Sequence, residues 1–366
     1  MTLKPLMAEI DEDVLCAIDA QNLPGAALAL IEGGEIFAIR TYGYADVASA
    51  RTITDQTQFS LQSVSKSLAA WGVMALVEDG LVDLDLAIDD YLTRWRLPAT
   101  SFDRRLVTAR RLLSHHAGIS TSGFPGIAPA FPDVTLIDGL NGNLPPLSED
   151  QLDYWRRWDL GTDWAARITY PPGEGWHYSN AGFGILELIV EQVTSSSFAD
   201  FMQQRILRPL GMHDSTYRPA EAACVATAYR ENGDVSPPLR YLSQAAGGLY
   251  ATIGDLAKFA CAEILSAGRP GRGIISEASL RHMFTSHGFA DATPEIQFET
   301  GLGHLLFSRN GLLNVHHSGG SIGWRSVYSV FPDKGAGLCM LVNSDGGNAL
   351  WIPQVRRWRE MIQANG

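Results

Sequence analysis

The segment Ser63–Val77, SVSKSLAAWGVMALV, is an apolar helical run that opens with a hydroxyl and an amine. Ser63 and Lys66 are three residues apart, and positions i and i+3 lie on one face of a helix, one turn apart. Of the four lysines in the chain, only Lys66 lies inside a strongly apolar segment. Because desolvation disfavours a charged amine, a buried lysine is costly unless it has a role. The pair is a candidate nucleophile and base, and the alternative is a lysine whose amine reaches the surface.

The composition is ordinary for a globular enzyme. The 366 residues allow one large domain or two lobes, with 46% apolar and 19% charged residues. A net charge of −12 argues against a nucleic-acid-binding surface. The cysteines are far apart and form no C-x-x-C pair, so neither a disulfide framework nor a zinc cluster is expected. Core-filling thiols are expected at Cys16, Cys224, Cys261 and Cys339.

No segment has the pattern of a targeting or membrane-spanning sequence. Residues 1–10, MTLKPLMAEI, lack a basic region followed by a long apolar stretch. No segment approaches about eighteen continuous apolar residues, so neither a transmembrane span nor a membrane partner is expected. We therefore expect a cytoplasmic protein, or a periplasmic or secreted one if a leader has been removed. The sequence does not indicate an oligomeric state.

Strand patterns occur at both ends of the chain. Residues 26–32 and 35–44 are β-rich runs separated by Gly33-Gly34, which is typical of a hairpin. Further strands are predicted over residues 301–308, 311–317, 324–331 and 336–343. Amphipathic helices are predicted over residues 8–20 and 349–362.

The middle of the chain is predicted to be mostly helical. Helices are predicted over residues 63–79, ended by Gly80, and over residues 110–114, 181–193, 198–206 and 254–265. The segment 118–172 is a long loop rich in Gly, Pro, Asp and Trp, and structureless loops of this length are often functional.

These elements predict an α/β fold of the α+β type. An antiparallel sheet is built from both chain ends and flanked by helices, with a mostly helical lobe inserted between them. We expect residues 1–366 to form one catalytic domain, with lobes of about 1–62 plus 250–366 and 63–249. The sequence contains no internal repeat that would suggest a different plan.

Tyr178-Ser179-Asn180 directly precedes a predicted helix. Ser and Asn are good helix N-caps, which accounts for Ser179 or Asn180 without any chemistry. Capping gives no role to Tyr178, whose phenol would have a pKa of about 10 in water. Because a neighbouring lysine stabilises the phenolate, Tyr178 is a candidate base.

His317-Ser318-Gly319-Gly320 ends a predicted strand. Glycine lets the backbone approach a ligand closely, and a free N–H at a strand edge can bind a carbonyl oxygen. The alternative for this tetrapeptide is an ordinary Gly-rich turn.

In order and spacing, these three motifs resemble those of the penicillin-recognising serine hydrolases. The sequence is most similar to the class C β-lactamase-like branch, which includes DD-carboxypeptidases, D-aminopeptidases and family VIII esterases. Three other segments resemble framework motifs of that family, so that the resemblance covers about residues 10–360: LLSHHAG at 112–118, RPLGM at 208–212 and GGLYAT at 247–252.

The resemblance implies a role for each matched residue. Ser63 would be the nucleophile that forms an acyl-enzyme, and Lys66 and Tyr178 would share the acid–base work. Asn180 would hydrogen-bond the substrate or orient Lys66. The backbone N–H groups of Ser63 and Gly320 would form the oxyanion hole. Substrate-binding residues would be Asn180, His317, Ser318, Gly319 and Gly320.

His317 departs from the family pattern, because β-lactamases carry a lysine at this position. An imidazole holds a substrate carboxylate less firmly than an ammonium does, so weak or no β-lactam hydrolysis is expected. Arg325, eight residues later, is a further substrate-binding candidate that would replace the missing charge. A surface salt bridge is the alternative for Arg325.

Other patterns are interpreted as structural features without a catalytic or metal-binding role. Residues 319–323, GGSIG, are similar to the nucleophile elbow of α/β-hydrolases, but that fold requires a histidine after the serine, and none follows Ser321. Adjacent histidines at 115–116 and 316–317 point apart, so no metal site is expected. His115 is interpreted as a packing or capping residue. Most of four tryptophans are expected to pack the long loop and at least one to face the pocket: Trp155, Trp158, Trp164 and Trp176.

Together these features predict a serine hydrolase without a cofactor that acts on a small ester, amide or peptide. One alternative is an acyltransferase that uses the same acyl-enzyme. The other is a penicillin-binding-like protein that binds its ligand without turnover.

Overall fold

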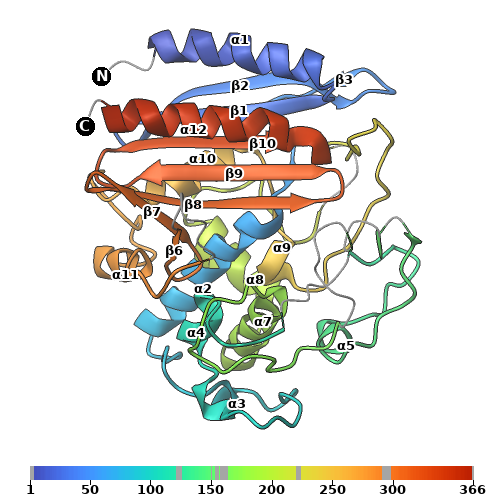
Figure 1. Ribbon diagram of the computed structural model, residues 1–366, viewed down its shortest axis with the longest axis vertical. Coiled ribbons are helices and arrows are strands. Elements are labelled where there is room, and N and C mark those ends of the chain that lie inside the picture. The colour runs from blue at the N-terminus through green and yellow to red at the C-terminus, as the bar shows by residue number, and fades with distance from the viewer. Residues whose placement is uncertain are drawn as a thin grey trace.

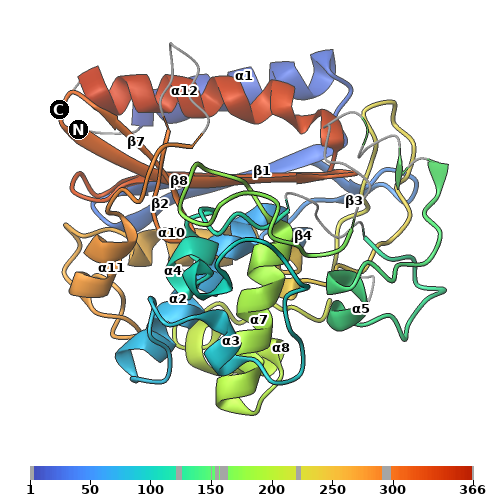
Figure 2. The same cartoon turned by 60° about the horizontal axis from the view of Figure 1, so that its bottom comes forward.

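The computed structural model describes residues 4–120, 126–149, 151–152, 156, 164–219, 224–290 and 298–364. In Figure 1, a twisted sheet crosses the upper half of the molecule, and most of the shorter helices lie below it. Two long helices, α1 (Lys4–Ala20) and α12 (Asn348–Ala364), lie on the other side of the sheet. Figure 2 shows the same three layers from a second direction.

The central sheet joins the two ends of the chain. Within the described residues it has eight strands in the order β3-β2-β1-β10-β9-β8-β7-β6, and each neighbouring pair is antiparallel. At its centre β1 pairs with β10, with Leu28 opposite Met340. The strands are β1 (Gly25–Glu32), β2 (Glu35–Asp46), β3 (Arg51–Thr52), β6 (Glu299–Thr300), β7 (Leu305–Arg309), β8 (Leu312–Ser321), β9 (Trp324–Phe331) and β10 (Ala336–Val342). A separate short pair consists of β4 (Phe59–Ser60) and β5 (Tyr250–Ala251).

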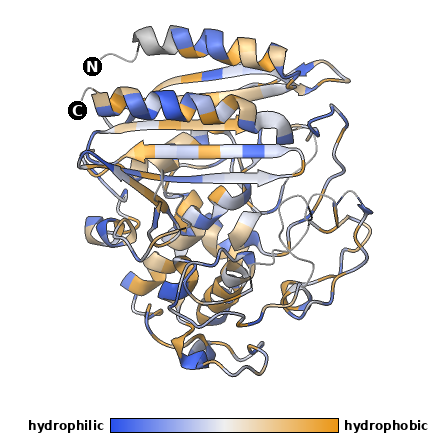
Figure 3. Cartoon of the chain, viewed as in Figure 1, coloured by the Kyte–Doolittle hydropathy of each residue, from blue (hydrophilic) through white to orange (hydrophobic). Residues whose placement is uncertain are grey.

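Strand β1 is buried on both faces, which explains its unbroken apolar run. Its side chains alternate between two hydrophobic clusters, because successive residues of a strand point to opposite faces. Leu28 and Leu30 pack in a cluster with Trp358 of α12, whereas Ala29 and Ile31 belong to the larger cluster below the sheet. Figure 3 shows hydrophobic colours along the strands and on the helices beneath them.

The helices below the sheet position the rest of the molecule. The longest are α2 (Ser65–Glu78), α7 (Asn180–Thr194) and α10 (Ile253–Ala262). Short helices are α3 (Ile88–Tyr91), α4 (Ala109–Leu113), α5 (Leu136–Leu140), α8 (Phe198–Met202), α9 (Gln244–Gly247) and α11 (Glu277–Met283). Single helical turns are η1 (Gln62–Val64), η2 (Arg104–Leu106), η3 (Gln203–Leu207) and η4 (Asp345–Gly347). None of the helices in the described ranges combines the length and hydropathy needed to span a bilayer.

The predicted fold class is confirmed, since one antiparallel sheet is built from both chain ends and helices flank it. Several details differ from the prediction. The strand expected over 301–308 begins only at Leu305, because a left-handed glycine turn at Gly303 interrupts the chain. The predicted long loop contains α5, and α11 was not predicted. Cys261 and Cys339 are buried as expected, whereas Cys16 and Cys224 are exposed. The division into two lobes stays a prediction.

The turn η1 packs directly against strand β8. A Cβ atom on Gly319 would lie 2.3 Å from the carbonyl oxygen of Leu61 and 2.9 Å from Cβ of Gln62. The hydroxyl of Ser326 on the neighbouring strand donates to the same Leu61 carbonyl at 2.6 Å. The missing side chain at Gly319 therefore allows the start of α2 to rest on the sheet.

Gly319→Ala should lower the free energy of unfolding by about 1–3 kcal/mol, because the added methyl group overlaps backbone atoms that cannot rotate away. Urea unfolding followed by circular dichroism measures this change. Gly268→Ala is the matched control, since a Cβ there meets nothing within 4 Å. Equal stability of Gly319→Ala and wild type would show that η1 does not depend on this close approach.

Candidate active site

Ser63 lies in the turn η1, immediately before α2, and its side chain is half-buried. The preceding residue, Gln62, has a φ of 49°, in the left-handed region that non-glycine residues rarely adopt. The residues on either side of Lys66 hold the start of α2. Ser65 Oγ accepts from the Leu249 N–H at 3.1 Å, and Ser67 Oγ donates to the Gly303 carbonyl at 2.8 Å.

The amine of Lys66 lies at the centre of the site and is fully buried. Its Nζ is 3.0 Å from Ser63 Oγ, 2.7 Å from Asn180 Oδ1 and 2.7 Å from the Ala246 carbonyl oxygen. These partners come from η1, α7 and α9. The alternative of a lysine that reaches the surface is therefore excluded.

Burial disfavours the protonated form of Lys66. Desolvation holds the pKa of this amine well below its usual range, and none of the three partners named above is a carboxylate. A neutral amine has two N–H groups and one lone pair. If Asn180 Oδ1 and the Ala246 carbonyl accept the two N–H groups, the lone pair is left to face Ser63 Oγ. This arrangement equips Lys66 to accept the serine proton.

Tyr178 approaches the same hydroxyl from the segment that precedes α7, two residues before the first residue of that helix. Its OH donates to Ser63 Oγ at 2.9 Å, and Lys66 Nζ lies 4.9 Å from the centre of its ring. The adjacent Ser179 is the N-cap of α7, with its Oγ accepting from the Gly182 N–H at 3.0 Å. The motif thus both caps the helix and brings Tyr178 to Ser63. Of the two roles considered for Asn180, its contact with Lys66 favours orientation of the amine.

His317 lies on β8 and is 4% exposed. Its Nδ1 donates to the Ser318 carbonyl at 2.7 Å, which leaves Nε2 as an acceptor in the neutral ring. Desolvation, with a smaller contribution from Lys66, lowers the pKa of His317 to about 3. At neutral pH the imidazole is therefore uncharged and offers no cation to a substrate carboxylate.

Arg325 is buried at the β8–β9 turn, so the surface salt bridge considered for it does not form. Its Nη1 donates to the carbonyl oxygens of Ser321 and Trp324, each at 2.7 Å, and its Nε donates to Asn348 Oδ1 at 3.0 Å. These contacts favour a role in bracing the turn. A role of Arg325 in substrate binding stays a prediction.

Other residues singled out in the sequence have different contacts or lie outside the described residues. Ser321, the serine of the GGSIG stretch, hydrogen-bonds through its hydroxyl to Tyr241 OH. Trp176 packs against Tyr178, with ring centres 5.9 Å apart. Trp155 and Trp158 lie outside the described residues. Across the parts of the chain that are described, no group of three or more His, Cys, Asp or Glu side chains has a metal-binding arrangement.

Sequence reasoning missed three parts of the site. The Ala246 carbonyl is a backbone group with no side-chain signature, and the left-handed φ of Gln62 has none either. His115, interpreted as a packing or capping residue, does pack, but the partner of its ring, 4.4 Å away, is Tyr178, which the sequence did not indicate. The LLSHHAG segment was the available signal for His115, but it does not reveal which residue the histidine contacts.

A cavity of about 1100 Å³ lies near the site and is lined in part by Gln244 and Gly248, on either side of Ala246. Its wall is mostly apolar and aromatic and includes Ile322, which follows the end of β8. Tyr250 also lines it and pairs with Ser60, three residues before Ser63. Ser63 and Lys66 are not among the described residues that line the cavity, so it is a neighbour of the site and does not contain the nucleophile.

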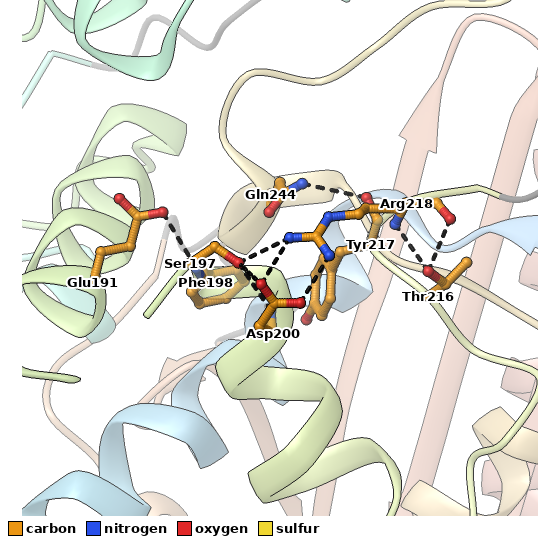
Figure 4. A network of polar contacts seen from close by, with 8 residues as sticks. All are labelled: Glu191, Ser197, Phe198, Asp200, Thr216, Tyr217, Arg218 and Gln244. Carbon is orange, nitrogen blue, oxygen red and sulfur yellow. Dashed lines mark hydrogen bonds and ion pairs between the residues drawn. The ribbon is translucent and has the colours of Figure 1, made fainter. Parts of the chain in front are cut away.

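Polar contacts hold one side of this cavity in place, as Figure 4 shows. Arg218 pairs with Asp200 of α8 at 2.7 Å and donates to Ser197 Oγ at 2.9 Å. Gln244 Nε2, at the start of α9, donates to the Tyr217 carbonyl at 3.3 Å. The cavity wall is thereby linked to the same short helix that supplies a hydrogen-bond acceptor to Lys66.

Comparisons with known proteins bear on the family and the fold of the chain. A family model described as Beta-lactamase matches residues 3–360. The chain is 27% identical to esterase EstB of Burkholderia gladioli, over 92% of this chain and 90% of that protein. The octameric penicillin-binding protein homologue of Pyrococcus abyssi is 25% identical with a TM-score of 0.73, covering 95% and 77% of the two chains. A class C beta-lactamase mutant has the same TM-score at 18% identity, over 94% and 95%, which shows a shared fold. The predicted resemblance is confirmed.

The lowered pKa of His317 makes stability depend on pH. Between about pH 3 and the ordinary histidine value near 6.5, the unfolded chain binds a proton that the folded chain does not. The stability that His317 contributes is thus present above about pH 6.5 and is lost as the pH falls. His317→Gln should therefore show a smaller fall in Tm than wild type between pH 7 and pH 5. The exposed His213, changed to Gln, serves as the control, and an unchanged Tm slope in His317→Gln would contradict the assignment.

Proposed function

The chain belongs to the beta-lactamase family, and from this we propose that it is a serine hydrolase that cleaves small uncharged esters or amides through an acyl-enzyme on Ser63. The observation that carries the proposal is the pair of contacts on Ser63 Oγ, from Lys66 Nζ at 3.0 Å and from Tyr178 OH at 2.9 Å. A hydroxyl placed between a desolvated amine and a phenol is equipped to lose its proton.

In the acylation step, Ser63 Oγ bonds to the substrate carbonyl carbon while its proton passes to Lys66, either directly or by relay through Tyr178, which gives up its own phenol proton as it takes that of Ser63. The bond to the leaving group then breaks, and the leaving group takes up that proton. The N–H groups of Ser63 and Gly320 would stabilise the oxyanion. Two features support an oxyanion hole formed by these two N–H groups. Backbone N–H groups at the start of a helix have no intrahelical partner, and β8 lies against η1 at Gly319, next to Gly320.

In the deacylation step, the oxygen of a water molecule bonds to the acyl carbon while one of its protons passes to Lys66, directly or by the same relay through Tyr178. The bond from that carbon to Ser63 Oγ then breaks, the acid is released, and Ser63 Oγ takes the proton back from Lys66. Product analysis with an added amine or alcohol separates hydrolysis from acyl transfer, because only transfer gives a new amide or ester.

The charge of the site supports an uncharged substrate. Lys66 and His317 are both buried with lowered pKa values, and Arg325 gives three hydrogen bonds to the protein. A substrate carboxylate placed here would lose its hydration without gaining a cation. The apolar cavity beside α9 supports an apolar acyl or alcohol group. We therefore expect weak or no β-lactam hydrolysis.

Ser63→Ala should abolish hydrolysis of p-nitrophenyl butyrate, because no other nucleophile would carry the acyl group. Lys66→Ala and Tyr178→Phe should each lower kcat by roughly 10²- to 10⁴-fold, as expected for loss of a general base. Initial rates and intact-protein mass spectrometry, which detects the acyl adduct, measure these effects. Ser321→Ala is the control and should keep activity. Full activity of Ser63→Ala would refute the proposed function.

The substrate's charge can be tested with two matched esters. p-Nitrophenyl butyrate and the p-nitrophenyl monoester of succinic acid have acyl chains of equal length, but only the second carries a carboxylate. We expect kcat/KM for the charged ester to be lower by roughly 10-fold or more, because its carboxylate would be buried unpaired. Equal values, or efficient hydrolysis of nitrocefin, would contradict an uncharged substrate.

A further inference from the structure

His115 packs against the ring of Tyr178. It follows α4 and is 6% exposed. Its ring centre lies 4.4 Å from that of Tyr178, with 33° between the planes. Phe183, whose ring also faces the Lys66 amine, is 5.4 Å from His115 on another side. The histidine therefore belongs to the wall against which Tyr178 rests.

The backbone of His115 holds the chain just before Tyr178. Its carbonyl oxygen accepts from the His177 N–H at 2.8 Å. Its φ of 62° is in the left-handed region, where His and Asn are enriched among non-glycine residues. Such a conformation persists only where the surroundings impose it, and it often occurs beside functional groups.

The ring of His115 holds the chain just after Tyr178. Nδ1 accepts from the Ser179 N–H at 3.1 Å. Since a backbone N–H can only donate, Nδ1 carries the lone pair, and the neutral ring has its proton on Nε2. Desolvation lowers the pKa of His115 well below its usual range, which keeps this lone pair available at neutral pH. The residue thus touches Tyr178 itself and hydrogen-bonds to both of its chain neighbours.

We propose that His115 is a positioning residue for Tyr178: its carbonyl, its Nδ1 and its ring together hold the phenol within hydrogen-bond reach of Ser63. This role rests on the proposed function, because it concerns the distance between Tyr178 OH and Ser63 Oγ. His115 does not contact the reacting atoms and acts through Tyr178. A small displacement of a catalytic group lowers the rate by up to roughly 100-fold, so the effect is measurable.

Two substitutions separate the parts of the contact. His115→Phe keeps an aromatic ring against Tyr178 but removes the acceptor for the Ser179 N–H. His115→Asn removes the ring, keeps a side-chain oxygen that can accept from Ser179, and suits a left-handed backbone. We expect kcat for p-nitrophenyl acetate to fall by roughly 10- to 100-fold in His115→Phe, with KM little changed, and to recover several-fold in His115→Asn.

A double-mutant cycle with Tyr178→Phe is the decisive measurement, and Tm is recorded for every variant. If His115 acts through Tyr178, adding His115→Phe to the Tyr178→Phe variant should lower kcat by less than about 3-fold. An equal loss of kcat with and without the Tyr178 hydroxyl would show a general structural role and overturn the inference. Failure of His115→Asn to recover any activity while remaining folded would also count against it.

His116→Phe is the matched control. His116 is the neighbouring histidine and is also buried, but its Nδ1 donates to the Ser114 carbonyl at 2.7 Å and its ring packs towards Gly288. It should keep wild-type kcat. Ser63→Ala distinguishes failure of the proposed function from failure of the role of His115. If Ser63→Ala stays active, the proposed function fails. If it is inactive and the double-mutant cycle shows no coupling, only the role of His115 fails.

Discussion

The arrangement around Ser63 depends on the removal of the Lys66 amine from water. Burial disfavours the positive charge, and three separate elements supply the contacts that replace hydration: η1, α7 and α9. Two of these elements are held in place independently. The turn η1 packs against β8, and the N-terminus of α7 is capped by Ser179. The lowered pKa of this amine is therefore a property of the whole helical layer and not of one side chain.

Much of this arrangement can be predicted from residue types and spacing. The pair Ser63 and Lys66 shares a helix face, and the β-rich segments at both chain ends predict one sheet that joins them. Tyr178 is identifiable because helix capping explains its neighbours and leaves it without a role. The fold is confirmed and these side chains do meet because each prediction depends on local periodicity or on a polar residue in an apolar context, whereas the catalytic roles stay predictions.

The rest depends on tertiary contacts that no local pattern encodes. The Ala246 carbonyl belongs to a residue without a functional side chain, and the burial that makes His317 neutral comes from strands and helices distant in sequence. Arg325 illustrates the same limit. Its charge suggests substrate binding or a surface pair, yet the structure places it among carbonyl oxygens at a turn. Which partner a charged group finds is decided by packing.

The left-handed backbone at Gln62 has a consequence for the choice of residue at this position. A non-glycine residue in this region costs of order 1 kcal/mol, which glycine would relieve. Glycine would also allow the chain beside Ser63 many more conformations, and the nucleophile would be held less firmly. Relief of backbone strain and a firmly held Ser63 therefore make opposite demands on position 62, where the Gln62 side chain also donates a buried hydrogen bond to Ser60 Oγ.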